Sequence, residues 1–155
     1  MQIFGVDEDP RSAAVSLGDR HVVKMCLETA QILCTVMSVN GIQAPYRPTH
    51  VNHPCVRWAA ESDRNWDWLH AHGLELAREY QFRYRRQHAC QSVIESLSRP
   101  PQLQASRLRR PVFTVMSLKE QYRVLDPVSA HRASYRIEKS HLHQYRRGRE
   151  APIWL

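Results

Sequence analysis

The chain has 155 residues, of which 43% are hydrophobic and 24% charged, and it carries a net charge of +7. This length and composition are typical of one compact domain, residues 1–155, and they exclude a disordered chain. No apolar run of about 18 residues and no signal-peptide pattern is visible, so we expect a cytoplasmic protein with no membrane partner. The four cysteines form no C-x-x-C pair, which predicts reduced thiols.

The positive charge lies in the second half of the chain. Residues 1–77 hold 6 Lys and Arg against 9 Asp and Glu, whereas residues 78–155 hold 16 against 6. Most of these cations are arginines, whose planar guanidinium groups bind phosphate through paired hydrogen bonds. The predicted partner is therefore a polyanion, most commonly nucleic acid, although a basic protein without such a partner has the same composition.

Local signals place the first helices. The opening sequence MQIFGV predicts a short strand or an extended arm. Asp9 followed by a proline predicts a short helix to about residue 17, since aspartate caps a helix and proline suits its first position. The sequence GD at 18–19 ends that helix and caps the next, which should run from residue 20 to about 39, where Asn-Gly ends it.

The rest of the chain predicts further helices joined by loops. Residues 41–54, with three prolines, predict an ordered loop, and a helix follows it. Ser62 caps a longer helix with an aromatic stripe. The Pro- and Arg-rich stretch 98–112 predicts a loop, and Ser117 and Asp126 start two more helices. An irregular aromatic and basic tail begins at about residue 144. Because only MQIFGV and VFTV resemble strands, we expect an all-α domain of five to seven helices.

The long helix near the N-terminus collects its polar side chains on one stripe. At 100° per residue, His21, Lys24, Glu28 and Gln31 fall within about 80° of one another, on a helix that is otherwise apolar. The stripe is either a solvated strip with a Lys24–Glu28 ion pair or the wall of a cleft. In a cleft, Glu28 could act as a general base or an electrostatic stabiliser, with Lys24 holding it ionised. Asp19 could cap the helix or orient His21.

The order L-x-D-x-H followed seven residues later by E resembles one family. Leu17, Asp19, His21 and Glu28 match the pattern of the phage pyrimidine-dimer DNA glycosylases, also called endonuclease V. The resemblance implies a single all-α domain in which an N-terminal α-amine attacks C1′ of the lesion's deoxyribose and forms a Schiff base. It also implies that Glu28 assists this step, and that arginines and an aromatic, basic tail hold kinked DNA.

The chain is also similar to small tailed-phage proteins, through DRHVVKMCLETAQ and PTHVNHPCVRWA. Both resemblances imply a protein of a bacterial or phage-infected cell. Two positions depart from the glycosylase pattern. Gln2 is large enough to protect the initiator methionine, so the candidate nucleophile is the amine of Met1 rather than that of a small residue. Leu27 and Thr29 stand where the family has arginines beside its glutamate.

The loop that ends at residue 54 holds further candidates. His50, Asn52 and His53 lie between prolines, which could make the loop stiff enough to place them against the Glu28 stripe. The alternative is a purely structural loop. His50, His53 and Cys55 could also supply part of a zinc site, but no C-x-x-C or H-x-x-x-H pattern accompanies them. We expect no metal and no cofactor.

The candidate DNA-binding residues are mostly arginines of the second half. They follow the aromatic helix, fill the Pro- and Arg-rich loop, lie four apart on a late helix, or belong to the tail. In chain order they are Arg83, Arg85, Arg86, Arg109, Arg110, Arg132, Arg136, Lys139, Tyr145, Arg146 and Arg147.

These patterns favour a monomeric enzyme that acts on a damaged or modified pyrimidine in double-stranded DNA. In this hypothesis it is a glycosylase, with or without abasic-site lyase activity, and His21, Lys24, Glu28 and Met1 form its catalytic set. Two alternatives remain. One is a transferase that modifies pyrimidines in phage DNA, and the other is a DNA-binding protein without catalytic activity.

Overall fold

The computed structural model describes all residues 1–155 and contains only helices. Six α-helices and two short 3₁₀ helices are present, and no strand is formed. They are α1 (Pro10–Ser16), α2 (Asp19–Val39), α3 (Pro54–Glu61), α4 (Asp63–Tyr84), α5 (Gln91–Ser96), η1 (Glu120–Tyr122), α6 (Pro127–Glu138) and η2 (Ser140–Leu142). The all-α prediction is confirmed, and MQIFGV forms an extended arm, residues 1–7, rather than a strand.

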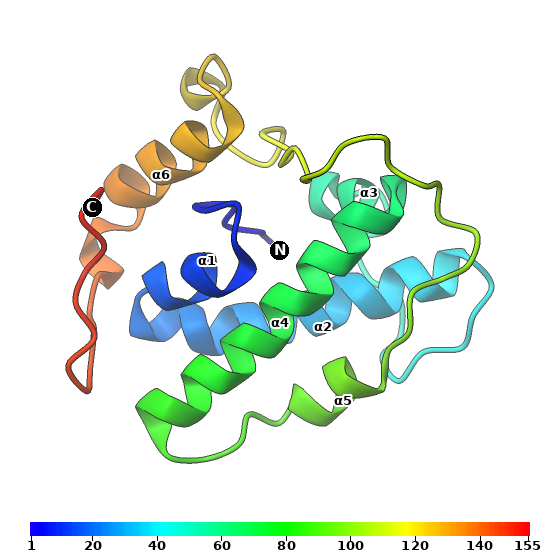
Figure 1. The fold of residues 1–155 in the computed structure, drawn as a ribbon, viewed down its shortest axis with the longest axis horizontal. Helices are drawn as coiled ribbons and strands as arrows, with labels where there is room; N and C mark the ends of the chain where they lie inside the picture. Colours follow the sequence, from blue (N-terminus) through cyan, green and yellow to red (C-terminus); the bar gives the residue numbers. More distant parts are fainter.

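The two long helices, α2 and α4, pack against each other at the centre of the molecule (Figure 1). Helices α1, α3 and α5 pack on α4, and α6 with the tail lies on the side where α2 begins. One hydrophobic core joins the arm to α1 through α5 and to Tyr135 of α6. Helix α2 is long and apolar enough to cross a membrane, but 67% of its apolar window is buried inside the protein. It is therefore the core helix of this fold.

Three of the helix starts predicted from capping residues form as expected. Side-chain oxygens of Asp9, Ser62 and Asp126 accept the N–H of the residue three positions on, at 2.8, 3.2 and 3.1 Å. Each bond satisfies a helix N–H that has no partner within the helix. These starts depend only on neighbouring residues, which is why the sequence places them well.

The helix predicted from Ser117 does not form. Only the 3₁₀ turn η1 follows, because Lys119 adopts an extended conformation, with φ −61° and ψ 148°, which no α-helix allows. The Ser117 hydroxyl makes no capping bond, and Arg123 Nε donates to the carbonyl of Leu118 at 2.9 Å. Leu118 and Tyr122 pack instead on Ala130 of α6.

The N-terminal arm is held by residues from the last third of the chain. A Cβ atom at Gly5 would overlap the ring of Phe113, so only glycine allows this close approach. Arg132 of α6 donates from Nε to the carbonyl of Val6 at 2.7 Å. These contacts fix the arm across the core and bring the first two residues to α2 and α3.

Candidate active site

Glu28 lies in the middle of α2 and meets the start of the chain. Its Oε2 accepts the backbone N–H of Gln2 at 2.8 Å, and its Oε1 lies 3.7 Å from the α-amine of Met1. Lys24, one turn earlier on α2, places Nζ 3.4 Å from the same Oε1. The residue is 7% exposed, so the carboxylate is almost withdrawn from water. One backbone N–H and two amino groups therefore surround a single buried carboxylate.

The side chain of Met1 is buried, whereas its main chain is partly exposed. The Met1 side chain is only 2% exposed and packs against the hydrophobic core, whereas the residue as a whole is half-buried. The exposed surface of this residue therefore belongs mostly to its main chain. A bulky first side chain thus does not block the amine, because it points into the core.

Gln2 and Cys55 link this carboxylate to the start of α3. The side-chain oxygen of Gln2 accepts from Ile3 N at 3.0 Å and from Cys55 Sγ at 3.4 Å. Burial raises the pKa of the Cys55 thiol to about 11, so it stays protonated and can serve as this donor. Gln2 was not predicted as a site residue, because nothing in its sequence context indicates a contact with Glu28.

The loop before α3 is anchored to α2 and carries His53 at the start of α3, next to Cys55. Thr35 and Thr49 exchange hydrogen bonds at 3.1 and 3.3 Å, which ties the loop to α2. His53 caps α3, with its Nδ1 accepting the N–H of Cys55 at 3.2 Å. Burial lowers the pKa of His53, and the nearby Met1 amine and His50 lower it further, whereas Glu28 raises it.

The other two loop candidates are exposed. His50 adopts a positive φ of 49°, and its ring bonds the Thr49 hydroxyl at 2.7 Å. Asn52 lines a cavity of about 230 Å³ with Arg57, Thr114 and other residues. No three His, Cys, Asp or Glu side chains of the chain come together as possible metal ligands.

His21, predicted as a catalytic residue, is buried and contacts other groups than Glu28 does. It is 5% exposed and packs edge-on against Phe4, with its Nδ1 2.8 Å from the hydroxyl of Tyr135. Gly18 N donates to that hydroxyl at 2.8 Å, so the hydroxyl proton is directed at Nδ1. Burial lowers the pKa of His21 to about 4, and the ring is neutral at pH 7.

The residues of the L-x-D-x-H motif therefore form a contact network between helices and the tail. A Cβ at Gly18 would lie 2.7 Å from the carbonyl oxygen of Leu142, so glycine permits the approach. Asp19 neither caps α2 nor orients His21, because the N-cap is Gly18 and the carboxylate binds two arginines. Asp19 N donates to Gln144 O at 2.8 Å. In this chain these contacts fasten the tail to the start of α2.

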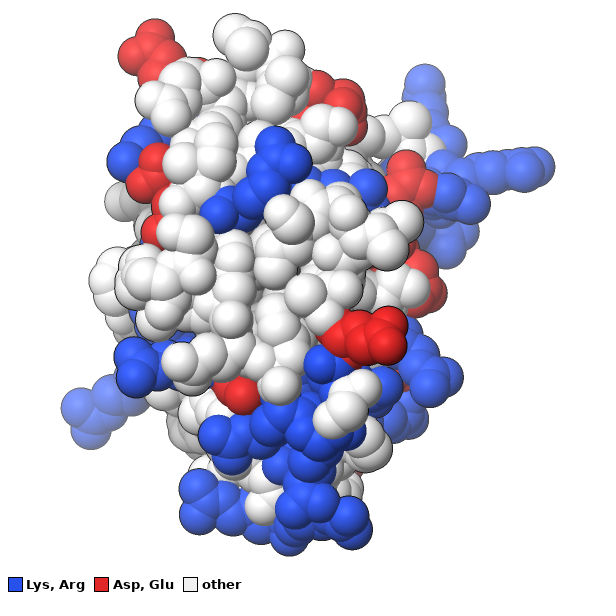
Figure 2. All heavy atoms as spheres, turned by 90° about the vertical axis from the view of Figure 1, so that its left-hand side faces the viewer, with Lys and Arg blue, Asp and Glu red and all other residues white.

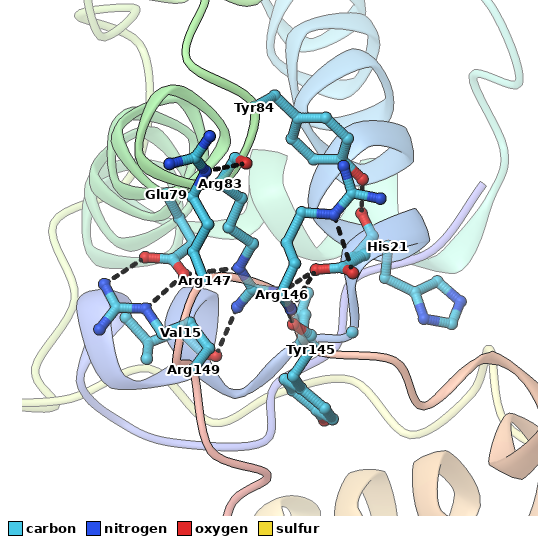
Figure 3. A network of polar contacts seen from close by, with 12 residues as sticks. Val15, His21, Glu79, Arg83, Tyr84, Tyr145, Arg146, Arg147 and Arg149 are labelled. Atoms are coloured by element: carbon cyan, nitrogen blue, oxygen red, sulfur yellow. Dashed lines mark hydrogen bonds and ion pairs between the residues drawn. The ribbon is translucent and has the colours of Figure 1, made fainter.

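Arg83, predicted to bind DNA, is buried within this network and binds groups of the protein itself. Its guanidinium binds Glu79 at 2.6 Å, Asp19 at 3.1 Å and the carbonyls of Leu17 and Val15 (Figure 3). The tail completes the network. Arg146 Nε donates to Asp19 at 3.1 Å. Arg149, which the sequence analysis did not single out, binds Glu79 through two bonds of 2.7 and 2.8 Å.

The remaining predicted DNA-binding residues are exposed or half-buried. Figure 2 shows Lys and Arg side chains gathered at the lower end of the face that carries α6 and the tail. Figure 1 places the C-terminal end of α4 and the turn of the tail at that height. The exposed members of the predicted set are Arg85, Arg86, Arg109, Arg110, Arg136, Arg146 and Arg147, and the half-buried ones are Arg132, Lys139 and Tyr145.

Several of these cations also have partners within the protein. Arg110 pairs with Glu8. Arg132 binds Asp7 at 3.2 Å and lies over the ring of Trp154, with its guanidinium carbon 5.4 Å from the ring centre. Arg132 thus fixes the arm and the tail, while its predicted neighbour Arg136 stays exposed.

Comparison with known proteins gives one family. A family model described as pyrimidine dimer DNA glycosylase matches residues 1–92. The match covers the arm and α1 through α4, and so includes Met1, Glu28 and His53, but it ends before α6 and the tail. Neither the curated proteins nor the solved structures contain a match.

Proposed function

Since this chain belongs to the pyrimidine dimer DNA glycosylase family, we propose that it removes a damaged or modified pyrimidine from double-stranded DNA. In this proposal the α-amine of Met1 is the nucleophile and Glu28 is the assisting carboxylate. The family supports an enzyme that acts on DNA. The assignment of the two residues rests on their position in this chain.

One observation carries the assignment. The Met1 amine lies 3.7 Å from Glu28 Oε1, at a point where its own side chain is packed away into the core. An α-amine attacks carbon once it has lost its proton, and Glu28 lies close enough to accept that proton. The bond from Gln2 N to Oε2 holds the carboxylate in place beside it.

The proposed chemistry uses both groups. The amine nitrogen attacks C1′ of the target deoxyribose, the bond from C1′ to the base breaks, and its electron pair leaves with the base. Glu28 takes a proton from the attacking nitrogen and stabilises positive charge at C1′. Opening of the sugar ring then gives the Schiff base, with a proton added to the ring oxygen. Water then hydrolyses the C=N bond and releases the amine, either directly or after β-elimination of the 3′ phosphate has cleaved the strand.

The charge distribution supports a route for DNA to this site. Arg20 and Lys24 are exposed on the same side of α2, and Arg146 binds Asp19 where that helix begins. Arg20 lies eight residues before Glu28, about 12 Å along the helix axis. A DNA backbone held by the basic end of the tail can therefore place a nucleotide at Glu28, provided that the nucleotide leaves the stack.

The test is borohydride trapping on a duplex that carries one cyclobutane pyrimidine dimer. We expect a covalent adduct with the intact protein, and peptide mapping should place it on the N-terminal peptide. Glu28→Gln should reduce trapping by about 10²-fold or more while duplex affinity survives. Glu120→Gln, a change at an exposed acid far along the chain, is the matched control and should trap as the parent does. Two methyl groups on the α-amine should abolish trapping, because a tertiary amine forms no Schiff base.

Other outcomes would contradict the proposal. Base turnover without an adduct would indicate group transfer to a modified pyrimidine. Salt-dependent duplex binding that ignores Glu28 and the lesion would indicate a binding protein. If Glu28→Gln only unfolds the chain, the carboxylate is structural.

A further inference from the structure

Two histidines in this chain share a local motif and differ in one contact. In His53-Pro54-Cys55 and His88-Ala89-Cys90, the histidine Nδ1 accepts the N–H of the cysteine, at 3.2 and 3.1 Å. A nitrogen that accepts such a bond carries no proton, so the proton of each neutral ring is on Nε2. The backbone thereby fixes the tautomer of both rings.

The two Nε2–H groups have different surroundings. His88 donates from Nε2 to the carbonyl of Val23 at 3.1 Å, a structural bond between the loop after α4 and helix α2. His53 Nε2 has no partner in the protein, and it is not among the buried polar atoms that lack one. It is therefore a donor of fixed direction that remains open to solvent.

The open donor belongs to the Glu28 site. Glu28 binds Gln2 N at 2.8 Å, the Gln2 side chain contacts Cys55 Sγ at 3.4 Å, and Cys55 N holds the His53 ring. These contacts connect the His53 ring to the Glu28 site, and the Met1 amine and Glu28 are near enough to shift the pKa of His53 in opposite directions. The lowered pKa of His53 keeps the ring neutral at pH 7, as does its place at the positive end of α3.

We propose that the Nε2–H of His53 donates a hydrogen bond to a carbonyl oxygen of the departing pyrimidine. This role rests on the proposed function, in which the base leaves with the electron pair of the broken C1′–N1 bond. The resulting negative charge spreads onto the carbonyl oxygens of the base, where a fixed donor stabilises it in the transition state. The imidazole keeps its proton, and the released base later takes one from water. A neutral histidine is suited to this task because it polarises a carbonyl without competing for a proton.

Three variants separate this role from the cap. In His53→Asn the amide oxygen can take the place of Nδ1 and keep the cap, since asparagine is a favoured N-cap, but the distal donor is lost. His53→Gln offers an amide N–H near the former Nε2 and loses the cap. His88→Asn is the matched control, because it makes the same change where Nε2 is bound to Val23.

Two substrates separate base departure from attack by the amine. Single-turnover base release is measured on the dimer-containing duplex, and borohydride trapping is measured on a duplex with a preformed abasic site, which has no base to lose. We expect His53→Asn to lower base release by about 10²-fold or more. Abasic-site trapping and Tm should stay close to those of the parent. His53→Gln should recover part of the base release at a lower Tm, and His88→Asn should release base at the parental rate.

The same measurements also distinguish the role of His53 from the proposed glycosylase function on which it rests. If the parent traps the abasic site but His53→Asn releases base at the parental rate, the role of His53 is wrong and the glycosylase proposal stands. Equal losses on both substrates would make His53 a positioning residue for the amine and would overturn the inference. If the parent traps neither substrate, both the inference and the proposed function fail.

Discussion

Arg83→Met would remove the centre of the network that fastens the tail to α2 and α4. The arginine has no exposed side-chain surface and binds two buried carboxylates, those of Glu79 and Asp19. Methionine fills a similar volume but offers no donor. Both carboxylates, and the carbonyls of Leu17 and Val15, would lose a partner in a place that water does not reach.

The expected loss of folding free energy depends on the ion pairs that the variant keeps. Removing one partner of a buried ion pair costs about 3–5 kcal/mol. Here Glu79 keeps Arg149 and Asp19 keeps Arg146, so we expect the lower end, about 3 kcal/mol. In a protein of this length, that loss lowers Tm by about 6–12 °C.

The assay is urea unfolding of Arg83→Met, Arg149→Met and the double variant, followed by circular dichroism. Because the double variant leaves Glu79 without a cation, we expect its loss to exceed the sum of the single losses by about 1–2 kcal/mol. Arg78→Met, at an exposed arginine of the same helix, is the control and should cost less than 1 kcal/mol. A loss below 1 kcal/mol for Arg83→Met, or strict additivity of the pair, would refute the reasoning.

Three further predictions concern acid, thiols and salt. Burial lowers the pKa of three histidines to about 4, and they are His21, His72 and His131. In the unfolded chain these histidines bind protons near pH 6.5, so the free energy of unfolding should fall as the pH drops from about 6.5 towards 4. The expected loss is roughly 2 kcal/mol per histidine at pH 5. Equal urea midpoints at pH 7 and pH 5 would contradict this prediction. Burial also raises the pKa of Cys26 to about 12 and that of Cys55 to about 11, and all four cysteines are buried. The native protein should therefore resist alkylation by iodoacetamide at pH 8, whereas all four thiols should react in urea. Mass spectrometry of the alkylated protein measures the difference. Arg147→Gln should weaken duplex binding and reduce the slope of log affinity against log salt concentration by about 1. Fluorescence anisotropy at several salt concentrations measures this slope. An unchanged slope would mean that Arg147 contacts no phosphate.

The sequence predicts those parts of the fold that depend on neighbouring residues. The caps at Asp9, Ser62 and Asp126 form where they were expected. The start at Ser117 fails because the chain is extended at Lys119, where Leu118 and Tyr122 pack on Ala130 of α6. Packing against a distant helix leaves no trace in the local capping pattern.

The surroundings of the candidate site residues also depend on contacts between residues distant in sequence. Periodicity places His21 and Glu28 only about 20° apart on α2. Their surroundings differ because Phe4 and Tyr135 cover the first turn of α2, whereas the chain terminus reaches the later turn. These covering residues lie up to 114 positions away in sequence. The stripe could therefore be predicted, but which of its members is accessible could not.

The arm gives the order in which this protein can become active. Residues 1–7 leave the ribosome first, yet their place is fixed by Phe113 against Gly5 and by Arg132 on the Val6 carbonyl. These partners are more than 100 residues downstream, so at about 5–20 residues per second they follow several seconds later. The Met1 amine cannot be set beside Glu28 in its final geometry until then. The contact between the Met1 amine and Glu28 is therefore completed by one of the last folding events.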